Sequence, residues 1–373
     1  MRKTLFSVVL ALALLVPVAL LHGQGFGNQP QGQISMWFID TEGGQATLLV
    51  TSTGQSMLID TGFPGNQGMP NGTADGPPMR DADRIMAVLK TANVTVLDYV
   101  VITHYHGDHV GNAAELAKRI PIKRFVDHGN YTVELQPGRN AGFVSYQPIR
   151  QMANVIVPKP GELLPLTGGV QALVLSNAGE LLNGSMAGVP GAGANNLLCK
   201  DAKLKEQDAT PENFESIGLA IRFGAFRLLD LGDLTWNQEH QLVCPTNQIG
   251  TFDVFHTTRH GDPHAGAPQL VHAIRARVAI MNNGERKGGD PSYWDIVHAA
   301  PGLQDFWQLH RSAAGGAEHN SPEQLLANLN EMDHGHNIKL VARPDGSFTM
   351  TNERTGFSKT YPAAARPATS SGQ

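Results

Sequence analysis

The sequence predicts an α/β (α+β) fold in which two β-sheets pack together and helices cover their outer faces. Short meanders of strands alternate with amphipathic segments, and this alternation occurs twice along the chain. The 41 Gly and 23 Pro residues indicate many turns between short elements. A chain of 373 residues suits one large layered domain, which we place at residues 30–361, followed by a disordered tail at 362–373.

The first half of the domain begins with three short strands and then alternates between helices and strands. A helix is predicted at 81–90 because its apolar residues recur on one face. A second helix is predicted at 110–120 and begins inside a His-rich turn. The predicted strands are apolar runs bounded by turn residues, at 34–40, 46–51, 56–60, 97–103 and 122–126.

The second half repeats this alternation. Two strands, 217–223 and 226–231, flank Gly224 and Ala225 and predict a hairpin. A helix is predicted at 321–330, with Ser321 as its N-cap and Pro322 at its first helical position. The other predicted elements are a helix at 268–274 and strands at 172–176, 252–256, 277–281, 338–342 and 347–352.

The N-terminus has the composition of a secretory signal peptide. Arg2 and Lys3 supply basic charge, and residues 5–21 are almost wholly apolar. We predict a signal peptide at residues 1–25 and an exported protein, periplasmic or secreted. An uncleaved anchor is the alternative. No other segment is long and apolar enough to span a bilayer, so no stable membrane span is expected after cleavage.

Charge, cysteine content and loop length add three expectations. The net charge of −5 gives no general attraction for nucleic acid, which leaves a small-molecule or short anionic substrate as the expected partner. Cys199 and Cys244 could form one disulfide in an oxidising compartment or remain unrelated thiols. Residues 177–211 are predicted to be a loop insertion, either a lid or binding element or a disordered segment.

The most informative motif is the turn His104-Tyr-His-Gly-Asp-His109, which directly follows the apolar strand at 97–103. Protonated imidazoles this close would repel one another, and neutral ones would compete for the same acceptors. A divalent metal removes this conflict because neutral imidazole and carboxylate are its natural ligands. The turn therefore predicts a metal site.

Two other regions are candidates for a functional site. Asp233 follows a Leu-rich strand and a Gly, so its carboxylate could face a cleft at the strand end, with an Asx turn as the alternative. Residues 293–320 are rich in Trp and His and either line a pocket or form a C-terminal cap with Trp307 in the core.

Five segments of the chain carry recognisable motifs: 40–49, 58–62, 103–111, 216–233, and 253–255 with 260–261. In the same order, they resemble the motifs of metallo-β-lactamase-fold hydrolases. The narrower resemblance is to the metallohydrolase domain of bacterial competence (DNA-uptake) proteins and their secreted relatives. It implies a four-layer αββα sandwich with a metal site at one edge.

The resemblance also implies a site for one or two ions, Zn2+ or alternatively Mn2+. Asp233 would bridge the two ions, and Asp60 would orient a ligand imidazole by a hydrogen bond. The other implied ligands are His104 and His106 for the first ion, and Asp108, His109 and His260 for the second.

This sequence departs from the family pattern in two places. No histidine occurs between residues 129 and 239, where the family usually supplies a third imidazole to the first ion. The third ligand of that ion is open, and His128 is an alternative. Arg259 stands where the competence branch has a histidine and could contact an anionic substrate. His264 is a second candidate for substrate binding, and it competes with His256 and His260 for the ligand position.

The implied activity is that of a metal-dependent hydrolase using a metal-bound hydroxide, with Asp108 orienting the nucleophile and shuttling a proton. A phosphodiester or other anionic ester is the expected substrate. The alternatives are hydrolysis of a β-lactam or lactone, and a non-catalytic binding protein on a degraded fold. An iron oxygenase is least favoured because that chemistry normally needs the absent histidine.

Overall fold

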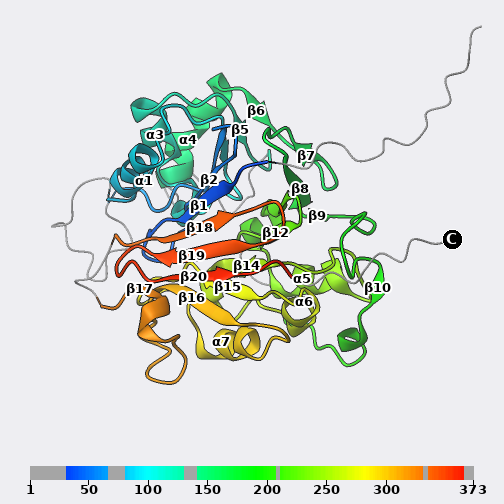
Figure 1. Ribbon diagram of the computed structural model, residues 1–373. Helices are drawn as coiled ribbons and strands as arrows, with labels where there is room; N and C mark the ends of the chain where they lie inside the picture. The colour runs from blue at the N-terminus through cyan, green and yellow to red at the C-terminus, as the bar shows by residue number, and fades with distance from the viewer. Residues whose placement is uncertain (1–30, 66–79, 130–140, 207–210, 331–334, 365–373) are drawn as a thin grey trace, which may run out of the picture.

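The computed structural model describes residues 31–65, 80–129, 141–206, 211–330 and 335–364. The predicted signal peptide and most of the predicted tail lie outside these ranges. Two large sheets face each other, and helices cover their outer faces, which is the predicted four-layer order (Figure 1). Within the described ranges, none of the helices is both long enough and apolar enough to cross a membrane.

The first sheet has nine strands and joins the N-terminal half of the chain to its last three strands, in the order β20-β19-β18-β1-β2-β3-β4-β5-β6. Its strands are β1 (Ile34–Phe38), β2 (Thr47–Val50), β3 (Ser56–Ile59), β4 (Tyr99–Val101), β5 (Phe125–Val126), β6 (Val155–Ile156), β18 (Ile338–Ala342), β19 (Phe348–Asn352) and β20 (Ser358–Tyr361). The helices on its outer face are α1 (Arg80–Thr91), α2 (Gly107–Val110), α3 (Ala113–Arg119) and α4 (Ala141–Met152).

The second sheet follows the order β17-β16-β15-β14-β12-β11-β8-β7, and β9 pairs with β8. Its strands are β7 (Leu163–Leu164), β8 (Val170–Asn177), β9 (Glu180–Leu181), β11 (Gly218–Phe223), β12 (Phe226–Asp230), β14 (Val254–His256), β15 (Val278–Met281), β16 (Asp305–His310) and β17 (Leu326–Asn328). The helices on its outer face are α5 (Trp236–Val243), α6 (Pro268–Ala273) and α7 (Pro291–His298).

Side chains of β1 and of the next residue, Ile39, are buried on both faces of the first sheet. Met36 and Phe38 point into the core between the sheets, whereas Trp37 and Ile39 pack beneath the helices of the first sheet. A strand buried on both faces has no solvated side, so its sequence reads as a continuous apolar run. The predicted hairpin is also present, because Phe223 pairs with Phe226 across β11 and β12.

The predicted helix at 321–330 is wrong. Pro322 is extended, a single 3-10 turn covers Glu323–Leu325, and β17 pairs with β16 in parallel. All three residues of β17 are buried, and the side chains of Asn352 and Arg354 donate hydrogen bonds to the carbonyl oxygen of Leu326. Tertiary pairing has overridden the local cap signal.

The predicted helix at 110–120 is two helices, α2 and α3, separated at Gly111. A Cβ on Gly111 would come within 2.3 Å of the carbonyl oxygens of both Gly107 and Gly62. This close approach packs the His-rich turn against the loop after β3, so the break in the helix helps to place the candidate metal ligands.

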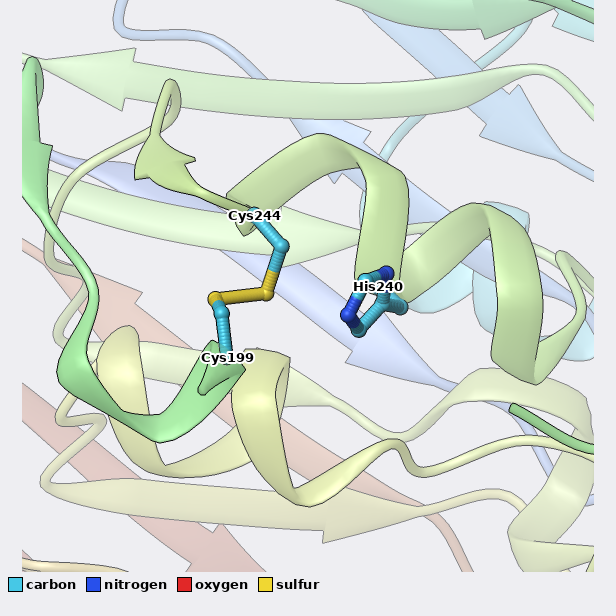
Figure 2. Close-up of side chains that lie close together, drawn as sticks. All are labelled: Cys199, His240 and Cys244. Atoms are coloured by element: carbon cyan, nitrogen blue, oxygen red, sulfur yellow. A yellow bond between two sulfur atoms is a disulfide. The ribbon is translucent and has the colours of Figure 1, made fainter. Parts of the chain in front are cut away.

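The predicted loop insertion at 177–211 contains β9, β10 (Ala194–Asn195) and a 3-10 turn at Leu197–Cys199. We call residues 194–206 the strap. A disulfide joins Cys199 of the strap to Cys244, the residue after α5 (Figure 2). The alternative of two unrelated thiols is therefore excluded.

The region 293–320 divides between the core and the surface. Trp307 is fully buried in β16, as the cap interpretation predicted. Trp294 and His298 stack on each other and line a hollow beside Asp305, at the start of β16. The candidate ligands instead follow the carboxyl ends of the neighbouring strands, so this hollow lies at the opposite edge of the sheet.

Candidate metal centre

The candidate ligands come from loops at the carboxyl ends of strands in both sheets. The turn after β4 supplies the His-rich motif, Asp233 follows β12, and His260 follows β14. Asp230 and His256 are direct neighbours in the parallel pairing of β12 and β14, which sets these last two loops side by side. The shared edge of parallel strands thus brings residues far apart in sequence into one site.

Four of the predicted ligands converge on a single point. The Nε2 atoms of His109 and His260 are 3.2 Å apart. Oδ2 of Asp108 lies 3.3 Å from the first of these atoms and 3.2 Å from the second. Oδ1 of Asp233 lies 3.3 and 3.4 Å from the same two atoms. All four side chains are buried.

The remaining two predicted ligands form a second, smaller group beside the first. Nε2 of His104 lies 2.9 Å from Nδ1 of His106, and 4.0 Å from Oδ2 of Asp233. Asp233 therefore turns one oxygen toward each group. This is the placement that a bridging carboxylate requires.

Asp60 holds the His109 ring in place from behind. Its Oδ2 lies 2.7 Å from Nδ1 of His109 and accepts from the Thr103 hydroxyl, while its Oδ1 accepts from the Thr103 backbone N–H. Because Nδ1 bonds to Asp60, Nε2 is the atom that His109 presents to the cluster, and it can ligate an ion once its proton is displaced. Asp60 adopts this position at a φ of 60°, a conformation that few residues other than Gly, Asn and Asp tolerate.

Burial and mutual contact decide the charges of the ligands. Burial, together with the rings of His109 and His106, holds the pKa of His104 well below its usual range, so this ring is neutral. Burial opposes ionisation of Asp233, but the His260 and His109 rings outweigh it and hold its pKa well below the usual range. Burial opposes protonation of His109, but the Asp233, Asp108 and Asp60 carboxylates outweigh it and hold its pKa well above the usual range. An ion that binds here must therefore displace a proton from this ring, because neutral imidazole and ionised carboxylate are the forms that bind a metal.

The donor set fits a divalent ion. The Nε2 atoms of His109 and His260 lie within hydrogen-bond distance of each other, and a carboxylate oxygen of Asp108 and one of Asp233 lie close to both. Oδ1 of Asp233 is buried and accepts no hydrogen bond among the described residues. A buried carboxylate oxygen without a donor is costly, and an ion ligated there would satisfy it. The residues present could therefore hold a metal at the four-residue group, with His104 and His106 forming a less complete second position.

The cluster opens into a pocket of about 200 Å3. Arg259 and Lys287 line this pocket together with His106, Asp108, Asp233 and His260. Arg259 and His260 both have positive φ values, 53° and 55°, in the loop after β14. Such strain in residues other than glycine costs roughly 1–3 kcal/mol each and is typical of functional loops.

Lys287 is a pocket residue that the sequence did not single out. Its ammonium group contacts Oδ2 of Asp108 and lies 5.0 Å from the centre of the Phe63 ring. Burial opposes ionisation of Asp108, but Lys287 and the His109 ring outweigh it and hold the pKa well below the usual range. Residues 284–290 are a Gly-rich, charged loop after the predicted strand at 277–281, but nothing in the sequence singles out Lys287 within this loop.

His128 does not join the second group of ligands, formed by His104 and His106. Its Nε2 lies 2.8 Å from Glu212 and its Nδ1 lies 2.9 Å from Glu215, so carboxylates occupy both ring nitrogens. Burial opposes protonation, but these carboxylates outweigh it and raise the pKa of His128 to about 9. His128 is thus a buried cation in an ion triad.

Glu212 links this triad to the His-rich turn and was also missed from the sequence. It accepts a hydrogen bond of 2.6 Å from the backbone N–H of Tyr105, the residue between His104 and His106 of the second group. Its neighbour Asn213 lines the pocket. The 3-10 turn Pro211–Glu215 therefore stands beside the position that lacks the usual third imidazole.

The remaining candidates divide between the pocket and its surroundings. Arg259 lines the pocket and pairs with Asp262 at 3.4 Å. His264 is 55% exposed, bonds to Asp262, and lies beside Lys205 and Trp236, outside the pocket of the metal cluster. Of the two predicted substrate-binding residues, Arg259 therefore lies in the pocket and His264 lies outside it. His256 does not line this pocket either, and its Nδ1 lies 3.0 Å from Asp230.

Comparison with known proteins agrees with this geometry. The model of the metallo-beta-lactamase superfamily matches residues 40–173, which include Asp60 and the His-rich turn. Residues 40–173 thus resemble a metallo-beta-lactamase superfamily domain. The fold of both halves is consistent with that superfamily, so the predicted fold class is confirmed.

Individual relatives of this chain are distant. A metal-dependent hydrolase from Thermococcus onnurineus (strain NA1) is 42% identical over 65 residues, which is 17% of this chain and 29% of the relative. A metallo hydrolase from Ignicoccus hospitalis shares 15% identity at a TM-score of 0.39, over 72% of this chain and 94% of that one. A structure described as a metal-dependent hydrolase from Parabacteroides distasonis shares 13% identity at a TM-score of 0.41, over 76% of this chain and 96% of that one. Likenesses this low carry no argument about activity.

Proposed function

We propose that this protein is an exported metal-dependent hydrolase whose substrate is a small anionic ester, with a phosphodiester as the first choice. The observation that carries the proposal is the presence of a buried donor cluster and two cationic side chains, Arg259 and Lys287, around one pocket. Zinc is the first choice of ion and manganese the second.

The ion supplies two effects when bound: it lowers the pKa of a coordinated water toward neutrality and polarises the scissile bond. The protein's own residues supply the rest. Asp108 borders the pocket and stays ionised, so it can orient a water molecule by accepting its proton in a hydrogen bond. Asp60 keeps the His109 ring fixed, so the donor cluster need not reorganise during the reaction.

The two cations explain the preference for an anion. A guanidinium group binds a phosphate or carboxylate with two parallel hydrogen bonds, and an ammonium group adds a point charge. The pocket of about 200 Å3 suits a small ester group better than a long polymer. The net charge of −5 likewise opposes general attraction of nucleic acid strands.

Export is supported by two independent features. Residues 1–25 have the composition of a signal peptide, and Cys199 and Cys244 form a disulfide, which is typical of oxidising compartments. N-terminal sequencing of the protein from a periplasmic or culture fraction tests this directly. A chain that keeps its first residues and stays in the cytoplasm contradicts it.

The activity test combines metal analysis with three substrates: bis-p-nitrophenyl phosphate, nitrocefin and a simple lactone. We expect bound metal, hydrolysis of the phosphodiester, and loss of both in an Asp108→Ala variant. Asp83→Ala, which removes an exposed carboxylate on α1, is the matched control. If only nitrocefin or only the lactone is hydrolysed, the substrate is a β-lactam or a lactone and not a phosphodiester. A metal-free protein inactive on all three would contradict the enzyme proposal and favour a binding protein.

A further inference from the structure

A second cluster of potential metal ligands lies away from the metal centre. Cys199, His240 and Cys244 sit together where the strap meets α5 (Figure 2). One ligand atom from each lies within 4.8 Å of the others. Asp233 precedes α5 and Cys244 follows it, so this eight-residue helix, about 12 Å long, separates the two sites.

The spacing of these residues suits metal binding. His240 lies in the last turn of α5 and Cys244 directly follows the helix, and Cys199 faces both from the strap (Figure 2). Two thiolates and one imidazole form a donor set that zinc prefers, with water as a fourth ligand. Burial lowers the pKa of His240, which keeps the imidazole in the neutral form that a metal needs.

The two sulfur atoms would stay close together without their covalent bond. Asn196 donates to the carbonyl oxygens of Val243 and Gln269, at 3.2 and 3.1 Å. Its own backbone N–H bonds to Pro245, and β10 pairs with β13 (Thr246–Asn247). These contacts flank both cysteines, so reduction would release two thiols into a site that is already assembled.

We propose that reduction of the Cys199–Cys244 disulfide converts this cluster into a zinc site with two thiolate ligands and His240. A dithiol reductant supplies two electrons and two protons, and it leaves as a cyclic disulfide. The sulfur–sulfur bond breaks to give two thiols. Zinc then binds both sulfurs and the imidazole, and the two thiol protons pass to solvent. The strap is thus closed on α5 in both states, by a covalent bond in one and by an ion in the other.

Cobalt(II) spectroscopy tests this proposal on the intact protein. These two cysteines are the only ones in the sequence, so a sulfur-to-cobalt charge-transfer band in the near ultraviolet can arise only from this site. We expect no such band when Co2+ is added to the oxidised protein. After reduction and removal of the reductant, we expect the band together with one additional equivalent of bound metal. The oxidised wild-type protein is the matched control and needs no mutation.

Two variants separate the ligands. His240→Gln keeps both thiols, so we expect the band to weaken and zinc affinity to fall at least tenfold, while the metal at the main centre is unchanged. Cys199→Ser should abolish the band. Reduced wild-type protein that shows no band and no additional equivalent would overturn the proposal. An unchanged spectrum and affinity in His240→Gln would overturn the role of the imidazole.

Discussion

Replacing Asp60 with asparagine is expected to weaken metal binding while leaving the fold intact. Asp60 is fully buried and accepts hydrogen bonds from the backbone and hydroxyl of Thr103, at 2.8 and 2.7 Å, and from Nδ1 of His109, at 2.7 Å. Asparagine has nearly the same shape and tolerates the positive φ of 60° at this position. The change therefore removes a charge and an acceptor without creating a cavity.

The expected loss of metal affinity follows from which hydrogen bonds the asparagine side chain can still form. The backbone N–H of Thr103 needs an acceptor, so the amide oxygen takes the place of Oδ1 and the amide NH2 takes the place of Oδ2. An NH2 group cannot accept from Nδ1–H of His109. The ring is then driven to the tautomer that carries its proton on Nε2, the atom that faces His260. Loss of such an outer hydrogen bond typically costs 10- to 100-fold in metal affinity, or about 1.4–2.7 kcal/mol.

The assay is a zinc titration against a competing chelator, with circular dichroism to check the fold. Asp83→Asn, which changes an exposed carboxylate paired with Arg119, is the control and should bind zinc as the wild type does. A folded Asp60→Asn variant that binds zinc as tightly as the wild type would refute the role assigned to Asp60.

Other changes probe the pocket and the buried triad. Glu212→Gln removes a charge from the Glu212–His128 pair. We expect the free energy of unfolding, measured by urea denaturation, to fall by about 3 kcal/mol. An unchanged free energy would show that the pair adds nothing to stability. Because the pKa of His128 is raised from 6.5 to about 9, its contribution to stability is fully present below pH 6.5 and is lost as the pH rises through about 9. Unfolding free energies measured across this range should therefore fall more in the wild type than in His128→Asn, and parallel curves would contradict the assignment. Lys287→Met should raise KM for an anionic ester by about tenfold, with a smaller effect on kcat, because it removes a charged hydrogen-bond donor from the pocket. An unchanged KM would exclude Lys287 from substrate binding.

The sequence was informative where the signal was local. His104, His106, Asp108 and His109 lie within one turn, so their residue types alone indicated a metal. The apolar runs before this turn and before Asp233 placed both at strand ends, because buried parallel strands have a continuous apolar sequence. The order of the motifs along the chain, which resembles that of metallo-β-lactamase-fold hydrolases, then predicted that Asp233 and His260 belong to the same metal site.

The parts that sequence missed depend on distant contacts. Lys287 meets Asp108 across 179 residues, and Glu212 meets Tyr105 across 107 residues. A lone Lys or Glu in a loop has no pattern that distinguishes it from a solvated charge. The helix predicted at 321–330 failed for the same reason, because pairing between β17 and β16 outweighs the cap signal at Ser321.

The most direct measurement of the metal centre is an anomalous difference map, recorded at the zinc edge from crystals of the protein as purified. We predict a peak bounded by Asp108, His109, Asp233 and His260, and a weaker or absent peak beside His104 and His106. A peak at the second group alone, or no peak at either group after zinc is added, would contradict the assignment of this cluster as the metal centre.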